Sequence, residues 1–161
     1  MSAIARFEHV SAAQFARDAA GFAQVLPVAE IPLPRRATPG SAGYDFACPV
    51  AVTLLPGQQA VIPTGIRVVM APGWVLLNCP RSSLGRKHGL RLANTVGVID
   101  GDYAQAENEG HILVALVNGG DHPVTLAPGE RFCQGLLLPI GLAEESAPSS
   151  VRTGGFGSTG A

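Results

Sequence analysis

Short apolar runs separated by tight turns dominate this chain. From Ile31 onward, segments such as AVTLL, WVLLNC, HILVALVN and FCQGLLLPI are rich in Val, Leu and Ile. The turns between such segments include Pro-Gly pairs at 39–40, 56–57, 72–73 and 128–129 and a Gly-Gly pair at 119–120. Runs of this length bounded by such dipeptides predict β-strands. Because nothing between them resembles a crossover helix, we expect an antiparallel, all-β sandwich or jelly roll.

Residues 1–30 have a different pattern, which predicts a strand followed by one short helix. Ser11 and Gln14 have the spacing of a capping box, and apolar residues on either side of them can share one face. We therefore expect a strand at Ala5–His9 and a helix over residues 12–20. This N-terminal extension precedes the strand-rich part of the chain.

Length and charge limit the classes of function. A chain of 161 residues suits one domain, residues 1–161, and we find no linker that divides it. Its 11 Lys and Arg residues nearly balance 12 Asp and Glu residues. Nucleic acid and anionic membranes call for a basic excess, so we expect neither as a partner. Low charge with many apolar residues also indicates that a partner subunit covers part of the surface.

Compartment and metal chemistry are judged from features that the sequence lacks. No apolar run is long enough to span a bilayer, and the first residues have no signal-peptide layout, so we expect a cytoplasmic protein. Cys48, Cys79 and Cys133 are scattered without CxxC spacing, and we expect buried, reduced thiols. The four histidines are equally dispersed, which argues against a structural zinc site.

Three segments depart from ordinary strand-and-turn composition. In SAGYDFACP, Asp45 is either a functional carboxylate or a strand-start aspartate bonded to its local backbone. In PRSSLGRKHGL, a guanidinium and two hydroxyls precede a glycine, as in a phosphate-binding loop or in a merely solvated one. These residues are Arg81, Ser82, Ser83 and Gly85. The P-loop and Rossmann patterns are absent from the sequence.

The third segment, NTVGVIDGDY, places Asp100 and Asp102 after an apolar pair. In an extended strand their carboxylates would point to the same face. One could then act as a general base while the other is held by neighbours or a metal. The alternative is a turn with two capping aspartates.

These segments, with GERFCQ at 129–134 and the closing GGFGSTG, occur in the order of the five motifs of the trimeric dUTP pyrophosphatases. The chain resembles that family from about Pro34 to its C-terminus. The resemblance implies a jelly-roll subunit in a homotrimer with shared active sites. One subunit would supply the first, second and fourth motifs, a second the third motif, and a third a mobile C-terminal arm, residues 151–161. The implied activity is Mg²⁺-dependent hydrolysis of dUTP to dUMP and pyrophosphate, which limits uracil in DNA and supplies dUMP for dTMP synthesis.

The resemblance also assigns catalytic roles. Asp100 matches the general base that activates a water for attack on the α-phosphorus, and Gln134 would help to orient that water. Mg²⁺ would be held by the three phosphates, with Asp45 touching its water shell. The Ser82 hydroxyl would lie near the leaving oxygen, and Arg131 is expected to be a structural ion-pair partner. The second-motif residues implied to contact substrate are Arg81, Ser82, Ser83 and Gly85.

Leu90–Tyr103 resembles the family's uracil-binding β-hairpin. Asn94 and backbone groups would satisfy the polar edge of uracil, and each mismatch with cytosine would cost about 1–3 kcal/mol. Tyr103 would pack against the deoxyribose and leave no room for a ribose 2′-hydroxyl. In the arm, Phe156 would stack on uracil. The other implied substrate contacts are Gly97, Val98, Ile99 and Asp100 in the hairpin and Gly157 in the arm, with Arg152, Ser158 and Thr159 on the β- and γ-phosphates.

The sequence departs from the family pattern in two places. The arm has RTGGF where RGxGGF is common, so one residue fewer separates Arg152 from Phe156. After Tyr103, AQAENEGHI stands in place of a shorter turn. Residues 104–110 are either a site for a regulatory protein partner or a tolerated surface insertion.

Two rival functions come from this comparison of motifs. dCTP deaminase has the same fold and can share the RSSLG segment, but it uses a glutamate in a different third motif, where this chain has VIDGDY. The pattern of a zinc-type deaminase is also absent from the sequence. The second rival is a nucleotide-gated binding module that captures a regulatory protein, and it could coexist with catalysis.

Overall fold

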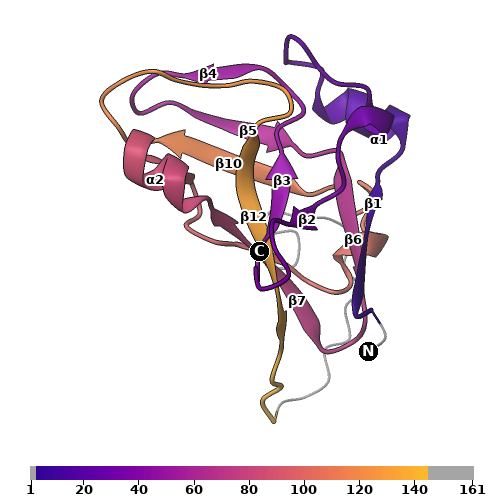
Figure 1. The fold of residues 1–161 in the computed structure, drawn as a ribbon. Coiled ribbons are helices and arrows are strands. Elements are labelled where there is room, and N and C mark those ends of the chain that lie inside the picture. The colour runs from indigo at the N-terminus through magenta and orange to yellow at the C-terminus, as the bar shows by residue number, and fades with distance from the viewer. Residues whose placement is uncertain (1–2, 145–161) are drawn as a thin grey trace.

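The structure is a computed structural model that describes residues 3–144 (Figure 1). The strands are β1 (Ala5–His9), β2 (Arg35–Arg36), β3 (Tyr44–Ala47), β4 (Val52–Leu54), β5 (Gln59–Pro63), β6 (Ile66–Met70), β7 (Trp74–Pro80), β8 (Leu90–Leu92), β9 (Gly97–Ile99), β10 (Leu113–Asn118), β11 (Val124–Leu126) and β12 (Arg131–Pro139). The helices are α1 (Ala12–Asp18) and α2 (Ser82–His88), with single 3-10 turns η1 (Val28–Glu30) and η2 (Tyr103–Gln105).

The described strands form four antiparallel sheets, and β12 is the middle strand of the largest one. A five-stranded sheet has the order β2-β3-β12-β7-β9, and a three-stranded sheet has the order β5-β10-β8. Strand β1 pairs with β6, and β4 pairs with β11. Every pairing between the described strands is antiparallel, which confirms the all-β, antiparallel prediction. Figure 1 shows the long strand β12 crossing the molecule between β3 and β7.

The N-terminal strand and helix form where the sequence predicts them, although α1 ends earlier than expected. Strand β1 covers the predicted residues, and α1 ends at Asp18 instead of residue 20. The Ser11 hydroxyl accepts a hydrogen bond from the Gln14 amide at 3.1 Å, which is half of a capping box. The other half is wrong, because the Ser11 amide donates to the Glu109 carboxylate at 2.7 Å instead of to Gln14. A residue far along the chain therefore completes the helix cap.

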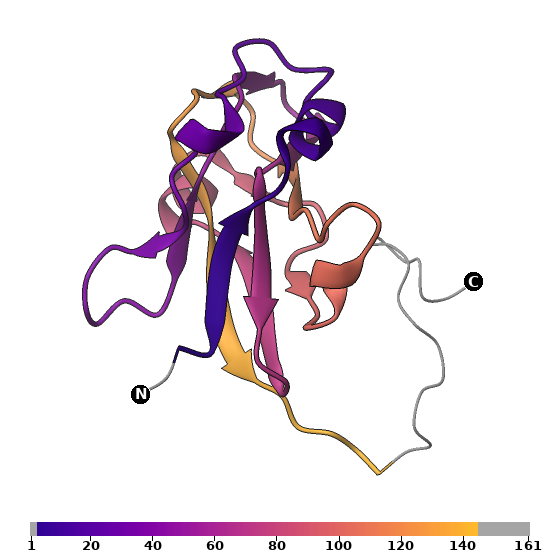
Figure 2. The same cartoon turned by 90° about the vertical axis from the view of Figure 1, so that its right-hand side faces the viewer.

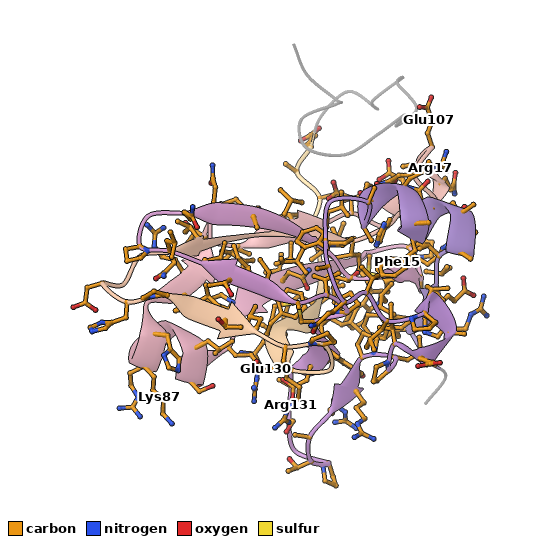
Figure 3. The ribbon with its side chains drawn as sticks, turned by 90° about the horizontal axis from the view of Figure 1, so that it is seen from above. Phe15, Arg17, Lys87, Glu107, Glu130 and Arg131 are labelled. Carbon is orange, nitrogen blue, oxygen red and sulfur yellow. The ribbon has the colours of Figure 1, made fainter. Side chains whose placement is uncertain are left out.

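One apolar core joins the sheets to the N-terminal helix. Its fully buried side chains come from separate strands and include Phe46, Ile62, Leu116 and Phe132. Phe15 of α1 belongs to the same core, and Figure 3 shows it on the inner side of the helix. Full burial of a side chain of this size contributes about 1.5–3 kcal/mol.

The cysteines agree with the expected buried thiols at two positions out of three. Cys48 and Cys133 are buried, Cys79 is half-buried, and all three are free. Burial raises the pKa of the Cys48 thiol to about 11 and raises that of Cys133 well above its ordinary value. Both buried thiols therefore stay protonated at neutral pH.

Helix α2 replaces a predicted loop. The glycine at position 85 led us to expect a turn within residues 80–90, but Ser82–His88 is helical. Gly85 lies within this helix, and the helix ends at Gly89, which has the left-handed conformation of a C-terminal cap (φ 66°). Neither helix among residues 3–144 is long and apolar enough to cross a membrane.

Candidate functional site

Asp45 lies at the centre of a charged cluster on the five-stranded sheet. One carboxylate oxygen contacts the Arg81 guanidinium at 3.2 Å, and the other accepts a hydrogen bond from Arg131 at 3.0 Å. Both arginines are partly exposed, whereas the Asp45 side chain is only 14% exposed. The ion pair predicted for Arg131 is therefore confirmed, and it joins the first, second and fourth sequence motifs.

Strand register explains why these motifs meet. Gln134 on β12 pairs with Asp45 on β3 and with Cys79 on β7, so it lies between the two other motifs. Its side-chain amide donates to the Pro80 carbonyl at 3.2 Å, beside Arg81. A Cβ at Gly43 would lie 2.3 Å from the Gln134 side-chain oxygen, so a larger residue there would displace the end of the Gln134 side chain. We call Asp45, Arg81, Arg131 and Gln134 the Asp45 cluster.

The two serines of the second motif begin α2 directly after Arg81. Arg81 is the N-cap residue of α2, and Ser82 and Ser83 occupy its first turn. Ser82 is exposed, whereas Leu84 is buried and anchors the helix on the core. The two serines thus follow Arg81 of the Asp45 cluster at the start of a helix, and not in the loop predicted from Gly85.

A cavity of about 480 Å³ opens beside Asp45. Arg35, Arg36 and Arg131 supply three guanidinium groups to its lining, against the single carboxylate of Asp45. This balance of charge suits an anion. Sequence reasoning missed the first two arginines, although the adjacent pair in LPRRAT was the available signal.

The predicted uracil hairpin is present as two strands, but they do not pair with each other. Strand β8 pairs with β10, and β9 pairs with β7, so the two arms of Leu90–Tyr103 belong to different sheets. The connection at residues 93–96 is largely exposed and includes Asn94. Val98 is 61% exposed, whereas Ile99 is buried. The strand alternation thus leaves one side of β9 open.

Asp100 and Asp102 lie in a turn, so the expectation that an extended strand aligns them is wrong. The chain turns at Gly101 and Asp102 before η2, and the Tyr103 amide donates to the Asp100 carbonyl at 3.1 Å. This bond couples the position of Asp100 to that of Tyr103. The Tyr103 side chain is buried, and its hydroxyl donates to the His111 carbonyl at 2.9 Å.

Asp100 and the Asp45 cluster lie apart within one chain. Ile99, which precedes Asp100, pairs with Leu76 of β7. Gln134 pairs with Cys79, near the other end of the same strand. The level of Asp100 differs from that of Gln134 by roughly 13 Å along β7, at about 3.3 Å per residue. Because β9 and β12 also flank opposite sides of β7, these two groups do not contact one small ligand atom within a single chain.

Residues 104–111 fold back onto the N-terminal helix. The Glu109 carboxylate accepts from the Ser11 amide and hydroxyl, and Asp18 contacts the His111 ring at 2.5 Å. Figure 2 shows this segment on the same side of the molecule as α1. Burial lowers the pKa of His111 below its ordinary value, although the Asp18 carboxylate acts in the opposite direction. The segment is thus packed into the fold through contacts with α1, which neither of the two alternatives stated for residues 104–110 included.

Two further predictions concern the C-terminal arm and the metal ion. Arg152, Phe156, Gly157, Ser158 and Thr159 lie outside the described residues. Within residues 3–144, no group of three or more His, Cys, Asp or Glu side chains could hold a metal ion. Asp45 is a single carboxylate with a guanidinium on each oxygen. This donor set fits a cation that arrives on ligand phosphates, and does not fit one held by the described side chains alone.

Comparison with sequence families places most of the chain in one of them. The family model described as dUTPase matches residues 29–160. A deoxyuridine 5'-triphosphate nucleotidohydrolase of Lactococcus lactis subsp. lactis is 46% identical over 136 residues, which cover 83% of this chain and 91% of that protein.

Solved structures have the same fold. The crystal structure of dUTPase from Streptococcus mutans superposes with a TM-score of 0.68 at 36% identity, covering 86% of this chain and 98% of that one. A dUTPase from phage phi11 of S. aureus, whose structure is described as coordinating a structural Mg(II) ion, superposes with a TM-score of 0.67. It is 18% identical, with 92% of this chain and 98% of that one covered, and it supports the fold alone.

Proposed function

The chain belongs to the dUTPase family, and from this premise we propose that it hydrolyses dUTP to dUMP and pyrophosphate. The observation that carries the proposal is the arrangement of its motifs. The Asp45 cluster presents guanidinium and amide groups suited to phosphate and is followed by the serines that begin α2, while Asp100 lies at another level of the sheet. Two half-sites of this kind fit an enzyme whose active site is completed by another subunit.

We take the assembly to be a homotrimer with three shared sites. One subunit contributes the Asp45 cluster, the next contributes Asp100 and the uracil segment, and the third contributes residues 151–161. Exposed large apolar side chains support an interface with other subunits, because contact with another subunit would remove them from water. They include Val98, Leu138, Ile140 and Leu142.

Asp100 is the general base in this proposal. It takes a proton from the water that attacks the α-phosphorus, and pyrophosphate leaves in line with the attack. Gln134 from the neighbouring subunit orients the same water, which must lie within about 3 Å of both groups. The reaction is a hydrolysis, so positioning and charge neutralisation supply most of the acceleration.

Arg81 and the serines of α2 bind the phosphates. The Arg81 guanidinium pairs with Asp45 in the absence of substrate, and it is 26% exposed, so a phosphate can compete for it. Arg131 keeps Asp45 paired when Arg81 turns to substrate. Ser82 and Ser83 donate to phosphate oxygens, with Ser82 nearest the leaving oxygen, and Gly85 allows close approach. Arg152, Ser158 and Thr159 complete the grip on the β- and γ-phosphates.

The segment around β9 selects the nucleoside. Asn94 and the backbone of Gly97, Val98 and Ile99 satisfy the polar edge of uracil, and Phe156 with Gly157 covers the base. Tyr103 packs against the deoxyribose and excludes a ribose 2′-hydroxyl. Mg²⁺ arrives on the three phosphates and supplies charge neutralisation, with Asp45 reaching its water shell. In a cell this activity limits uracil in DNA and supplies dUMP for dTMP synthesis.

A subunit-mixing experiment tests the shared site. Asp100→Asn and Arg81→Ala are each expected to abolish most dUTP hydrolysis as pure proteins. Co-expressed with different affinity tags, they form mixed trimers in which some sites combine two intact halves. Over all trimers formed from equal amounts of the two chains, each half of a site is intact with a chance of one in two, so about one site in four regains full activity. In trimers that carry both tags the share is about one site in three.

Three further results would contradict the proposed function or one of its parts. A mixture as inactive as its two components would mean that each chain builds its own site. Wild-type protein that releases ammonia from dCTP, with no pyrophosphate from dUTP, would replace the proposed activity by deamination. The regulatory partner of residues 104–110 stays a prediction, and a partner whose binding is unchanged by deletion of this segment would contradict it.

A further inference from the structure

The hydroxyl of Tyr103 is held by the segment that distinguishes this chain from the shorter family pattern. It donates to the His111 carbonyl at 2.9 Å and accepts from the Asn108 side-chain amide at 2.8 Å. Tyr103 is 8% exposed, so water cannot readily replace these partners. Both bonds come from residues that follow η2 in the chain, five and eight positions after Tyr103.

The orientation of the Asn108 amide follows from its other contact. The Gly110 backbone amide can only donate, and it lies 3.2 Å from the Asn108 side-chain oxygen. The oxygen of Asn108 is therefore an acceptor, and its NH₂ group faces Tyr103. The tyrosine hydroxyl then accepts from Asn108 and sends its single proton to the His111 carbonyl. Donors and acceptors match at each of these contacts.

The His111 ring is held by Asp18 of α1 and by Gly65, the residue directly before β6. The Gly65 amide can only donate, and it lies 2.8 Å from Nε2 of His111. Nε2 is therefore an acceptor, so the ring proton sits on Nδ1 and is donated to Asp18. The His111 side chain is fully buried. The chain of contacts thus runs from α1 through His111 to the hydroxyl of Tyr103, and we call Asp18, His111, Asn108 and Tyr103 the Tyr103 network.

We propose that Asn108 is a positioning residue for sugar discrimination, acting through the hydroxyl of Tyr103. The inference rests on the proposed function, in which the ring of Tyr103 packs on deoxyribose and excludes a 2′-hydroxyl. Steric exclusion of one oxygen works only while the ring cannot tilt, because a shift of about 1 Å opens enough space to weaken it. Two hydrogen bonds at the far end of the ring resist that tilt. The long segment after Tyr103 therefore has a role within the site.

The test compares sugar and base discrimination in the same variants. Asn108→Ala removes the donor, and Tyr103→Phe removes the hydroxyl while keeping the packed ring. Steady-state kinetics with dUTP, UTP and dCTP would give kcat/KM for each substrate. We expect the preference for dUTP over UTP to fall on the order of tenfold in Asn108→Ala, which loses one buried hydrogen bond to the hydroxyl. It should fall at least as far in Tyr103→Phe, which loses both bonds of the hydroxyl. The preference for dUTP over dCTP stays at its wild-type value, because β9 and its flanking turn select the base.

The double variant and a matched control sharpen the result. Asn108→Ala combined with Tyr103→Phe should lower the dUTP-to-UTP preference no further than Tyr103→Phe alone, since the hydroxyl through which Asn108 acts is then already absent. Glu109→Gln weakens the contact with Ser11 and leaves the hydroxyl of Tyr103 untouched, so its dUTP-to-UTP preference should equal that of the wild type.

The outcomes separate this inference from the proposed function. If the wild-type protein fails to hydrolyse dUTP, the proposed function itself is wrong. Wild-type protein that prefers dUTP to UTP, with the same preference in Asn108→Ala and Tyr103→Phe, overturns only the positioning role. An equal loss of kcat/KM for all three nucleotides would also overturn it, because that pattern reports general loosening of the fold.

Discussion

The Asp45 cluster and the Tyr103 network are both polar, but they differ in charge and exposure. In the Asp45 cluster two guanidinium groups share one carboxylate, and the side chain of Arg131 is 54% exposed. In the Tyr103 network the His111 ring is fully buried, and each hydrogen-bond donor of the network faces an acceptor. Partly exposed charges can change partners when an anionic ligand arrives, whereas a buried, matched network cannot. The chain thus keeps groups that bind separate from groups that set geometry.

Asp100 is proposed to act on the bound ligand and is also tied to the Tyr103 network, and its replacement should have the largest effect on activity. Its carbonyl accepts a hydrogen bond from the amide of Tyr103, which ties the backbone of Asp100 to the rigid network. Asp100→Asn should lower kcat for dUTP by about 10²–10⁴-fold, the usual contribution of a general base. Asp102→Asn is the neighbouring control, and an equal loss of kcat there would argue against Asp100 as the base.

The rigidity of the segment after Tyr103 can be tested at Gly110. This glycine has a φ of +72°, and a Cβ would lie 2.6 Å from Ala104 Cα and 2.7 Å from the Tyr103 carbonyl oxygen. Gly110→Ala should therefore lower the free energy of unfolding by about 2–4 kcal/mol, from backbone strain and a clash with main-chain atoms. Gly73→Ala has a similar φ of +83° but open space, so it should cost only about 1 kcal/mol in chemical denaturation. Equal losses would mean that the clash is relieved by movement of the segment.

The Tyr103 network should also give stability a dependence on pH. Burial lowers the pKa of His111 in the folded protein below its ordinary value of 6.5, against the opposing carboxylates of Asp18 and Glu109. The unfolded state therefore binds this proton more readily. The stability that neutral His111 contributes is fully present above pH 6.5 and is lost as the pH falls from 6.5 through the lower pKa of the folded protein. Urea unfolding between pH 8 and pH 5 should show this fall. His111→Gln should be less stable at pH 8 and lose less on acidification, whereas parallel curves would contradict the assignment.

Local signals predicted the elements whose ends are set by neighbouring residues. The Ser11 cap and the Pro-Gly turns marked α1 and many of the strand limits. Helix α2 was missed because Gly85 was taken as a turn residue, although its backbone is helical and the C-terminal cap is Gly89. Propensity alone did not decide this segment, since burial of Leu84 anchors the helix.

Contacts between distant residues were beyond the reach of local patterns. The Ser11 hydroxyl and the Glu109 carboxylate are 98 positions apart, and Asp18 and His111 are 93 apart. Nothing in either local sequence marks its partner. The Asp45 cluster was easier to predict in part, because the family resemblance named Asp45, Arg81 and Gln134. Their meeting on three adjacent strands follows from register, which the sequence alone does not provide.

The smallest loss of stability is expected for a substitution in the Asp45 cluster, and it allows a direct comparison with the Tyr103 network. Arg131→Gln removes a charge from Asp45 but leaves Arg81 in place, and the replaced side chain is more than half exposed. The free energy of unfolding should fall by under about 1 kcal/mol, because solvent screens such a pair. Asp18→Asn removes a charge from the buried ring of His111 and should cost about 1–3 kcal/mol. Urea titrations of the two variants at pH 8 give both numbers. A loss at Arg131 as large as that at Asp18 would show that the Asp45 cluster also fixes the fold, and that its arginines are not readily released to a phosphate.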